Sequence, residues 1–244
     1  MPKGLLLEVK TGRGAFMSHL KDAVALARMM VAIGENAKVK TRALITSMEQ
    51  PLGGAVGNFV EVREAVDVLD PSAPSRRSQK YMDNVRSVRE LALTQVAAML
   101  CMSGQSASFQ EAHARAERKL EDGSALDLFG HMIEMQGGDP RVLAACDEHL
   151  ERNTHSSIVV RAPRDGRIKV VDAFRVGMSS LALGCGRLHA DDPIDPIAGI
   201  QVHVKVGDVV HRGDALMTVS VGHADVPGYT PTQRLERGAK RARE

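Results

Sequence analysis

The sequence predicts an α/β protein in which a partial α/β sheet-and-helix layer is followed by helices and by a C-terminal β-rich, barrel-sandwich-like domain. Two observations support this class. Near the N-terminus, an apolar run, an amphipathic segment and a second apolar run follow one another, which is typical of parallel strands joined by a crossover helix. After about residue 154, the spacing of apolar residues changes from about 3.6 toward 2, which favours strands over helices.

The predicted layer begins with residues 5–9, an apolar run that indicates a buried strand entering a glycine-rich turn. A helix should follow, with Ser18 as its N-cap and Gly34 as its end. Its buried face is expected to consist of four residues at helical spacing, Leu20, Val24, Ala27 and Val31. A second strand is predicted at residues 39–46. Strand, helix and strand together form one parallel crossover unit.

A loop with one proline and three glycines spans residues 48–58 and permits close backbone approach. The helix after it is expected to bury a face made of Ala55, Phe59, Val62, Val66 and Leu69. We therefore assign residues 1–69 to the remnant of an α/β domain.

Residues 70–153 are predicted to continue as helices. Residues 70–83 are polar, basic and proline-containing, which indicates a surface excursion. Capping boxes at Ser108 with Glu111 and at Ser124 with Asp127 predict two helix starts. Gly-Gly-Asp-Pro at 137–140 ends the last helix. The helix before these is expected to bury a stripe made of Val85, Val88, Ala92, Val96 and Met99.

Residues 154–222 are predicted to form the β-rich domain, because short β-branched runs alternate there with Asp-Gly and Gly-Asp turns. A short helix ending at a glycine is expected at residues 179–186. The spacing of strands and turns is similar to half of a biotinyl or lipoyl carrier domain. A carrier needs a modifiable lysine at a hairpin tip, whereas Lys169 and Lys205 fall inside strand patterns, which argues against that function.

Composition excludes several classes of protein. No apolar run approaches the roughly 20 residues of a membrane span, and no secretory signal is evident, so a cytoplasmic protein is expected. Three separated cysteines suggest neither disulfides nor a zinc site.

The net charge of the chain is +2. Its last twelve residues carry five basic and two acidic side chains, so the net charge of the rest is near −1. That balance argues against nucleic-acid binding, and residues 223–244 are expected to form a basic, disordered tail.

Two local patterns could carry chemistry. Gly12-Arg13-Gly14 lies between a strand and a helix, but a dinucleotide fingerprint would need a third glycine where Met17 stands. A structural turn that lines a pocket with Phe16 and Met17 is the favoured interpretation. Glu61 and Glu64 lie one helical turn apart after the glycine loop. They form an ordinary charged face, unless carbonyls of the loop join one carboxylate around a hard cation.

Several motifs in combination resemble the family of pyrimidine-nucleoside and thymidine phosphorylases, over about residues 4–222. They are Val9-Lys10, Gly12-x-Gly14-Ala15-Phe16-Met17, Thr41-x-Ala43-Leu44-Ile45-Thr46-x-Met48-x-Gln50-Pro51-Leu52-Gly53, Ala55-Val56-Gly57-Asn58, Glu61-Val62-Arg63-Glu64-Ala65, Gly137-Gly138-Asp139-Pro140, Leu183-Gly184-x-Gly186-Arg187 and Val206-Gly207-Asp208-x-Val210-x-x-Gly213-Asp214. The resemblance implies phosphate-dependent cleavage of a pyrimidine nucleoside to the free base and a pentose 1-phosphate. Inorganic phosphate is then the co-substrate, and no organic cofactor is needed.

The resemblance also implies which parts of the site this chain holds. The family's Lys-x-Ser-Thr-Gly-Gly phosphate loop and its base-binding Arg and Ser-x-x-x-Lys residues do not occur here, so we expect no catalytic residue in this chain and no activity without a missing N-terminal half. Phe16 and Met17 match an apolar wall near the pyrimidine. Leu52 and Ala55, through backbone oxygens, and Glu64, through its carboxylate, match part of a structural monovalent-cation site.

This sequence departs from the family at two places. Glu8 stands where the family usually has Asp, and residues 70–83 look longer than its usual connection. The family forms homodimers, mostly through the N-terminal helical domain, so the resemblance does not decide whether this chain dimerises. Neither a nucleic acid nor a membrane is expected as a partner. The alternative function is a non-catalytic scaffold or interaction module derived from the same family.

Overall fold

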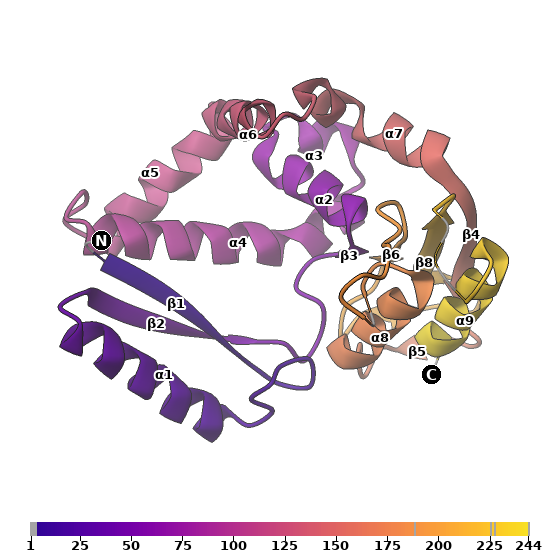
Figure 1. Cartoon of the computed structure of the whole chain (residues 1–244), viewed down its shortest axis with the longest axis horizontal. Coiled ribbons are helices and arrows are strands. Elements are labelled where there is room, and N and C mark those ends of the chain that lie inside the picture. Colours follow the sequence, from indigo (N-terminus) through magenta and orange to yellow (C-terminus); the bar gives the residue numbers. More distant parts are fainter. Residues whose placement is uncertain (1–3, 188, 225, 227, 244) are drawn as a thin grey trace.

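The computed structural model describes residues 4–187, 189–224, 226 and 228–243 and confirms a mixed α/β protein (Figure 1). Its elements, in chain order, are β1 (Gly4–Thr11), α1 (Leu20–Asn36), β2 (Lys40–Ser47), β3 (Ala55–Gly57), α2 (Phe59–Leu69), α3 (Ala73–Arg76), α4 (Gln79–Met102), α5 (Phe109–Glu121), α6 (Ser124–Met135), the 3-10 helix η1 (Pro140–Ala145), α7 (Cys146–Asn153), β4 (Thr154–Arg161), β5 (Gly166–Arg167), α8 (Ala173–Leu183), β6 (Gly199–Val202), β7 (Val209–Val210), β8 (Ala215–Gly222) and α9 (Pro231–Arg243).

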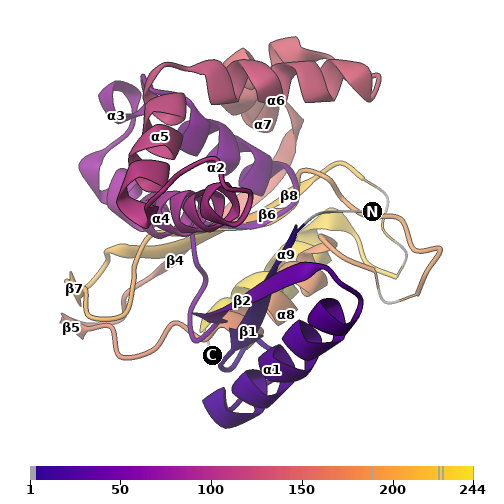
Figure 2. The same ribbon diagram turned by 90° about the vertical axis from the view of Figure 1, so that its left-hand side faces the viewer.

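The N-terminal layer is the expected crossover unit. β1 and β2 pair in parallel, from Gly4 opposite Lys40 to Thr11 opposite Ser47, and α1 connects them. α1 and α4 lie on opposite sides of this two-stranded sheet in both views (Figures 1 and 2). Its core is small: Val9, Ala23 and Ala27 are its buried members.

Helix α1 departs from the sequence prediction at both ends. Its N-cap is His19 rather than Ser18, and it continues through Gly34 to Asn36. Gly34 does not stop the helix. A Cβ at this position would lie 2.0 Å from Thr41 Oγ1, so glycine lets helix and strand approach closely. The buried face is centred on Ala23 and Ala27, while Leu20 is exposed.

The helical part also corrects several expectations. Ala55 belongs to β3, not to the helix after the loop. In α4 the buried side chains are Asn84, Val85, Leu93, Ala97 and Ala98, whereas Val96 and Met99 of the predicted stripe are exposed. Ser108 caps α5 as predicted, because its Oγ accepts from the N–H of Glu111 at 3.2 Å.

The second capping prediction is wrong. Gly123, in a left-handed conformation, precedes α6, and Ser124 is already inside the helix, with its hydroxyl and N–H bonded to Asp122. The prediction for the end of α6 is confirmed, since the helix stops at Met135, just before the Gly-Gly-Asp-Pro turn. Residues 70–83 are more ordered than a surface excursion: they contain α3 and the start of α4, and Ala73 is fully buried.

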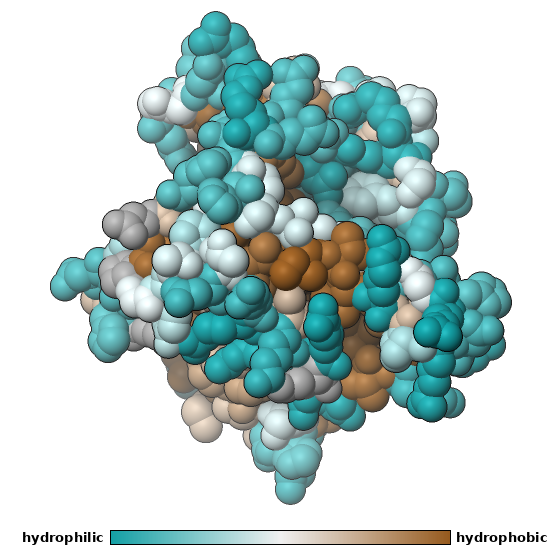
Figure 3. Space-filling model, turned by 90° about the vertical axis from the view of Figure 1, so that its right-hand side faces the viewer, coloured by the Kyte–Doolittle hydropathy of each residue, from teal (hydrophilic) through white to brown (hydrophobic). Residues whose placement is uncertain are grey.

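The C-terminal part contains a four-stranded sheet in the order β3-β6-β8-β4, antiparallel throughout. β3 comes from the loop after β2, so the sheet includes a strand from the first predicted unit. β5 and β7 form a separate short pair. The described strands therefore form small open sheets, where a barrel-sandwich was expected. Figure 3 shows this side of the molecule, which is mostly hydrophilic with one apolar area near its centre.

The C-terminal core is the larger one. It joins β4, β6 and β8 with α8 and α9, and its fully buried members include Leu183, Ile200, Val202, Val219 and Val221. α8 ends at Gly184 in the left-handed conformation, which confirms the short helix expected there, although it begins earlier, at Ala173.

The prediction of a disordered tail is wrong for residues 231–243, which form α9. Thr230 and Gln233 make a reciprocal capping box: Thr230 N–H donates to Gln233 Oε1 at 2.9 Å, and Gln233 N–H donates to Thr230 Oγ1 at 3.3 Å. Leu235 and Ala239, one turn apart, are buried against the C-terminal core. Arg234 is buried too, and its Nη1 lies 3.0 Å from Asp195 Oδ2.

Candidate functional site

The loops that follow β1 and β2 meet at the carboxyl ends of these parallel strands. Met48 N–H donates to Thr11 O at 2.6 Å, and Gly14 N–H donates to Met48 O at 3.0 Å. Gly12 has φ +111°, and a Cβ on it would lie 2.9 Å from Glu49 N. This crowding, together with the left-handed backbone, requires glycine. The glycine turn is thus a packing element, the interpretation favoured from the sequence.

Arg13, at the tip of this turn, is held by two carboxylates. Its Nε lies 3.1 Å from Glu49 Oε2, and its Nη1 lies 3.6 Å from Asp172 Oδ2, at the N-terminus of α8. A Cβ on Gly14 would lie 2.9 Å from Ala173 Cβ, so backbone and side chains together join the glycine turn to α8. The charge of Arg13 is balanced inside the chain.

Phe16 and Met17, the predicted apolar wall, differ in their surroundings. Phe16 is fully exposed at 105% of its reference area. Met17 is half-buried and packs against the small core of Val9, Ala23 and Ala27. The turn therefore presents a free aromatic ring beside the strand ends. A role for either residue in binding a substrate stays a prediction.

Glu64, the predicted carboxylate of a cation site, is buried at 5% exposure and faces the loop before β3. Its Oε1 accepts from the N–H groups of Gly54 at 2.6 Å and Ala55 at 3.0 Å. A Cβ on Gly53 would lie 1.9 Å from Glu64 Oε2, so glycine at this position makes room for the carboxylate. Burial raises the pKa of Glu64, although the two N–H donors and the charge of Lys205 oppose the rise.

Lys205, which follows β6, reaches the same loop. Its Nζ donates to Pro51 O at 2.7 Å, to Leu52 O at 3.0 Å and to Gly53 O at 2.6 Å. Burial lowers the pKa of Lys205 to about 8, against the opposing charges of Glu64 and Asp208. Ala55 thus meets Glu64 through its N–H group, Leu52 O is bound by Lys205, and an ammonium group lies beside this loop. A role for Leu52, Ala55 and Glu64 in holding a cation stays a prediction.

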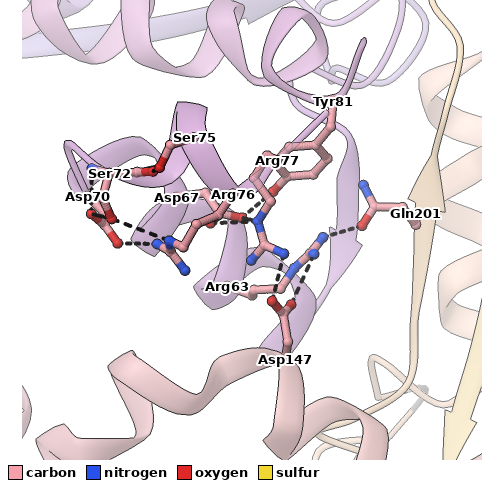
Figure 4. A network of polar contacts seen from close by, with 10 residues as sticks. All are labelled: Arg63, Asp67, Asp70, Ser72, Ser75, Arg76, Arg77, Tyr81, Asp147 and Gln201. Carbon is pink, nitrogen blue, oxygen red and sulfur yellow. Dashed lines mark hydrogen bonds and ion pairs between the residues drawn. The ribbon is translucent and has the colours of Figure 1, made fainter. Parts of the chain in front are cut away.

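A second polar cluster joins α2, the start of α4 and α7 (Figure 4). Asp67, buried on α2, accepts from Arg77 Nε at 3.0 Å and from the Tyr81 hydroxyl at 2.7 Å. Arg77 Nη1 also donates to Asp147 Oδ2 at 2.6 Å, and Arg63 Nη1 lies 3.4 Å from Asp147 Oδ1. Burial and the neighbouring Asp67 raise the pKa of Tyr81, so its hydroxyl stays protonated and donates. This cluster is a charge-balanced clamp between helices.

Two features are absent from the residues that the structure describes. Among the residues that the structure describes, no three His, Cys, Asp or Glu side chains lie close enough together to hold a metal ion. Within the same residues, no helix combines the length and the apolar character needed to cross a membrane.

Sequence reasoning missed Lys205 and the clamp around Asp67. The sequence offers Lys205 no role beyond that of a carrier lysine, because its three carbonyl partners lie more than 150 residues away. The Gly-Asp turn after it was the only local signal: Lys205 N–H donates to Asp208 Oδ2 at 2.7 Å and so fixes the turn. Asp67 and Arg77 carried no signal, since charged residues on helices and in polar connections are ordinarily solvated.

Comparison with known proteins identifies the class of this chain. The α/β domain of a glycosyl transferase family matches residues 3–126, and the C-terminal domain of pyrimidine nucleoside phosphorylases matches residues 167–226. The second match includes α8 and the strands β6 to β8. The chain belongs to the pyrimidine nucleoside phosphorylase family.

Individual relatives agree with this assignment. The chain is 38% identical over 222 residues to the pyrimidine-nucleoside phosphorylase of Staphylococcus haemolyticus, with 91% of this chain and 48% of the relative covered. It is 37% identical over 224 residues to the enzymes of two Staphylococcus aureus strains, RF122 / ET3-1 and USA300, with the same coverage. The chain therefore spans about half the length of the curated relatives it matches.

Proposed function

We propose that this chain supplies the C-terminal part of a pyrimidine-nucleoside phosphorylase, which cleaves the N-glycosidic bond of a pyrimidine nucleoside with inorganic phosphate. The free base and a pentose 1-phosphate are the products. The observation that carries this proposal is the exposed Phe16 at the carboxyl end of a two-stranded parallel sheet, in a chain that belongs to this family. Ligands of open α/β sheets bind at that end of the strands.

The chemistry explains why the chain should need another segment. The sugar becomes oxocarbenium-like while the base leaves as an anion, so the site must hold phosphate and donate protons or positive charge to the base oxygens. Arg13, the cation of the glycine turn, is already paired with Glu49 and Asp172. We assign this chain no catalytic residue. Phe16 and Met17 serve as an apolar wall for the pyrimidine ring.

The partner that we propose is a segment equivalent to the N-terminal half of the relatives, carrying the phosphate loop and the base-binding residues. Such a segment would extend the two-stranded sheet and cover the apolar side chains beside it. Leu5 of β1 and Ile45 of β2 are partly exposed, at 41% and 37%. The cytoplasmic location expected from the sequence stays a prediction.

Phosphorolysis assays test this proposal. The purified 244-residue chain should release no thymine or uracil from thymidine or uridine with phosphate. Adding the separately produced N-terminal half of the S. haemolyticus relative should restore phosphate-dependent release. Activity of the chain alone would overturn the proposal, and so would a complex that forms without activity, since it would favour the scaffold alternative. That alternative draws support from the larger buried core of the C-terminal part.

A variant pair sharpens the assay. In the restored enzyme, Phe16→Ala should raise KM for the nucleoside about 10-fold or more, because the variant loses apolar contact with the base. Met29→Ala, at 63% exposure on α1, removes an exposed apolar side chain away from the strand ends and should leave KM unchanged. Equal effects of the two substitutions would contradict the role of Phe16.

A further inference from the structure

The cation site that the family resemblance implies does not fit a separate metal ion in this chain. A monovalent cation would be held by the carbonyl oxygens of Leu52 and Ala55 and by the Glu64 carboxylate. Here Leu52 O accepts from Lys205 Nζ at 3.0 Å. Glu64 Oε1 accepts from two backbone N–H groups, those of Gly54 and Ala55. Leu52 O and one carboxylate oxygen of Glu64 are thus already occupied by groups of the chain itself.

We propose that the Lys205 ammonium group takes the place of the metal ion, as a cation tethered to the C-terminal part of the chain. An ammonium has three N–H donors and no acceptor. Lys205 finds three converging carbonyls, at 2.7, 3.0 and 2.6 Å, on the consecutive residues 51–53. Every donor is therefore matched, and the loop is gathered around the charge as it would be around a bare ion.

The surroundings hold the ammonium in place from both sides. The backbone N–H of Lys205 donates to Asp208 Oδ2, and the same carboxylate oxygen forms an ion pair with Lys80 of α4. Val206 N–H donates to Gln50 Oε1 at 3.0 Å, which joins the turn after β6 to the loop that Lys205 binds. Glu64 and Asp208 provide the negative charges that favour the ammonium.

The consequence is a positioning role. The loop at residues 51–55 leads from the carboxyl end of β2 into β3, which pairs with β6. Lys205 therefore connects the N-terminal layer to the C-terminal sheet by a charge-assisted tie. A metal ion in this position could dissociate, whereas the lysine cannot. The chain should need no added monovalent cation for this connection. This inference concerns stability and does not depend on the proposed enzymatic activity.

Thermal unfolding in different salts at fixed ionic strength tests the inference. The wild-type midpoint should be the same in lithium, potassium and ammonium chloride. Lys205→Met should lower the midpoint by about 5 °C in lithium chloride, because three charge-assisted hydrogen bonds are lost. Ammonium and potassium ions should restore part of this loss, since each can enter the vacated carbonyl cluster. Lys169→Met removes an exposed lysine and is the matched control, with no salt-specific change expected.

Three results would overturn the inference. The first is a wild-type midpoint that rises in potassium relative to lithium, since that would show a separate metal site. The second is a Lys205→Met midpoint that does not distinguish the three cations. The third is a salt-specific response of Lys169→Met equal to that of Lys205→Met. If Lys205→Met does not fold in lithium chloride, refolding in ammonium chloride supports the inference, and failure in all three salts contradicts it.

Discussion

The N-terminal layer and the C-terminal part differ in how completely each buries its apolar side chains. In the C-terminal part, Leu183, Ile200 and Val219 are fully buried, and they come from α8, β6 and β8. In the N-terminal layer, the buried set is Val9 with two alanines, while Leu20, Met29 and Ile33 of α1 are 61–63% exposed. The same chain thus holds one nearly self-sufficient core and one incomplete core.

This difference follows from the number of elements that each part can pack. Two strands and one helix bury too little apolar area for independent stability, which usually requires three or more strands or a larger helical cover. The N-terminal layer therefore depends on α4 and on the ties made by Arg13 and Lys205 to other parts of the chain. An additional segment that widens the sheet would complete it.

Breaking the buried ion pair between Arg234 and Asp195 should have the largest effect on stability. Arg234→Met would leave Asp195, which is fully buried, without its cation and should reduce the free energy of unfolding by about 3–5 kcal/mol. Urea unfolding measures this loss. Lys240→Met, on the exposed face of α9, is the control and should change stability by less than about 0.5 kcal/mol. A loss under about 1 kcal/mol for Arg234→Met would show that α9 adds little to the C-terminal core.

The same substitution, valine to alanine, compares the core of the C-terminal part directly with the core of the N-terminal layer. Val219→Ala, on β8, should reduce the free energy of unfolding by roughly 2–3 kcal/mol, because the cavity is enclosed on all sides. Val9→Ala, on β1, should reduce the free energy of unfolding by only about 1 kcal/mol, because the few neighbours of Val9 can relax into the space. Denaturant unfolding of both variants provides the measurement. Equal losses would contradict the difference between the two cores.

The helix clamp should give a smaller, pH-dependent effect. Burial opposes ionisation of Asp147, but the hydrogen bond and charge of Arg77 and the charge of Arg63 outweigh it and hold the pKa of Asp147 below its usual 3.8. Its contribution to stability is therefore present above pH 3.8 and lost as the pH falls through the lowered pKa. The contribution should be about 0.5–1 kcal/mol, since Asp147 is half-exposed.

Urea unfolding of wild type and Asp147→Asn at several pH values checks this sign. The stability difference should be constant from pH 7 to 5 and should shrink toward zero below pH 3.8. Glu148→Gln, at the exposed neighbouring position on α7, should show no such pH-dependent difference. A difference that grows as the pH falls would contradict the role assigned to Asp147.

Much of the fold could be predicted from local pattern. The β1-α1-β2 unit, the cap at Ser108 and the end of α8 at Gly184 all follow from periodicity and capping chemistry. α9 was missed because its many basic residues suggested a solvated tail. The overlooked signals were the Thr230-x-x-Gln233 capping box and the apolar pair Leu235 and Ala239.

The candidate site was less predictable because its contacts are long-range. The resemblance implies that Leu52, Ala55 and Glu64 share a cation site, whereas the structure shows Glu64 bound by N–H groups of the loop and Leu52 O bound by Lys205. Nothing near Lys205 in the sequence indicates that its ammonium reaches the loop at residues 51–53. Gly34 shows the same limit. Glycine is required there because Thr41 of β2 packs against it, and not because the helix ends there.

Hydrogen exchange of backbone amides, measured on the 244-residue chain, tests the contrast between the two parts most directly. We predict that amides in β8 exchange only with opening free energies close to that of global unfolding, whereas amides in β1 and β2 exchange with distinctly lower ones. Protection of the β1-β2 amides equal to that of β8 would contradict the account, because it would show that the N-terminal layer is already complete.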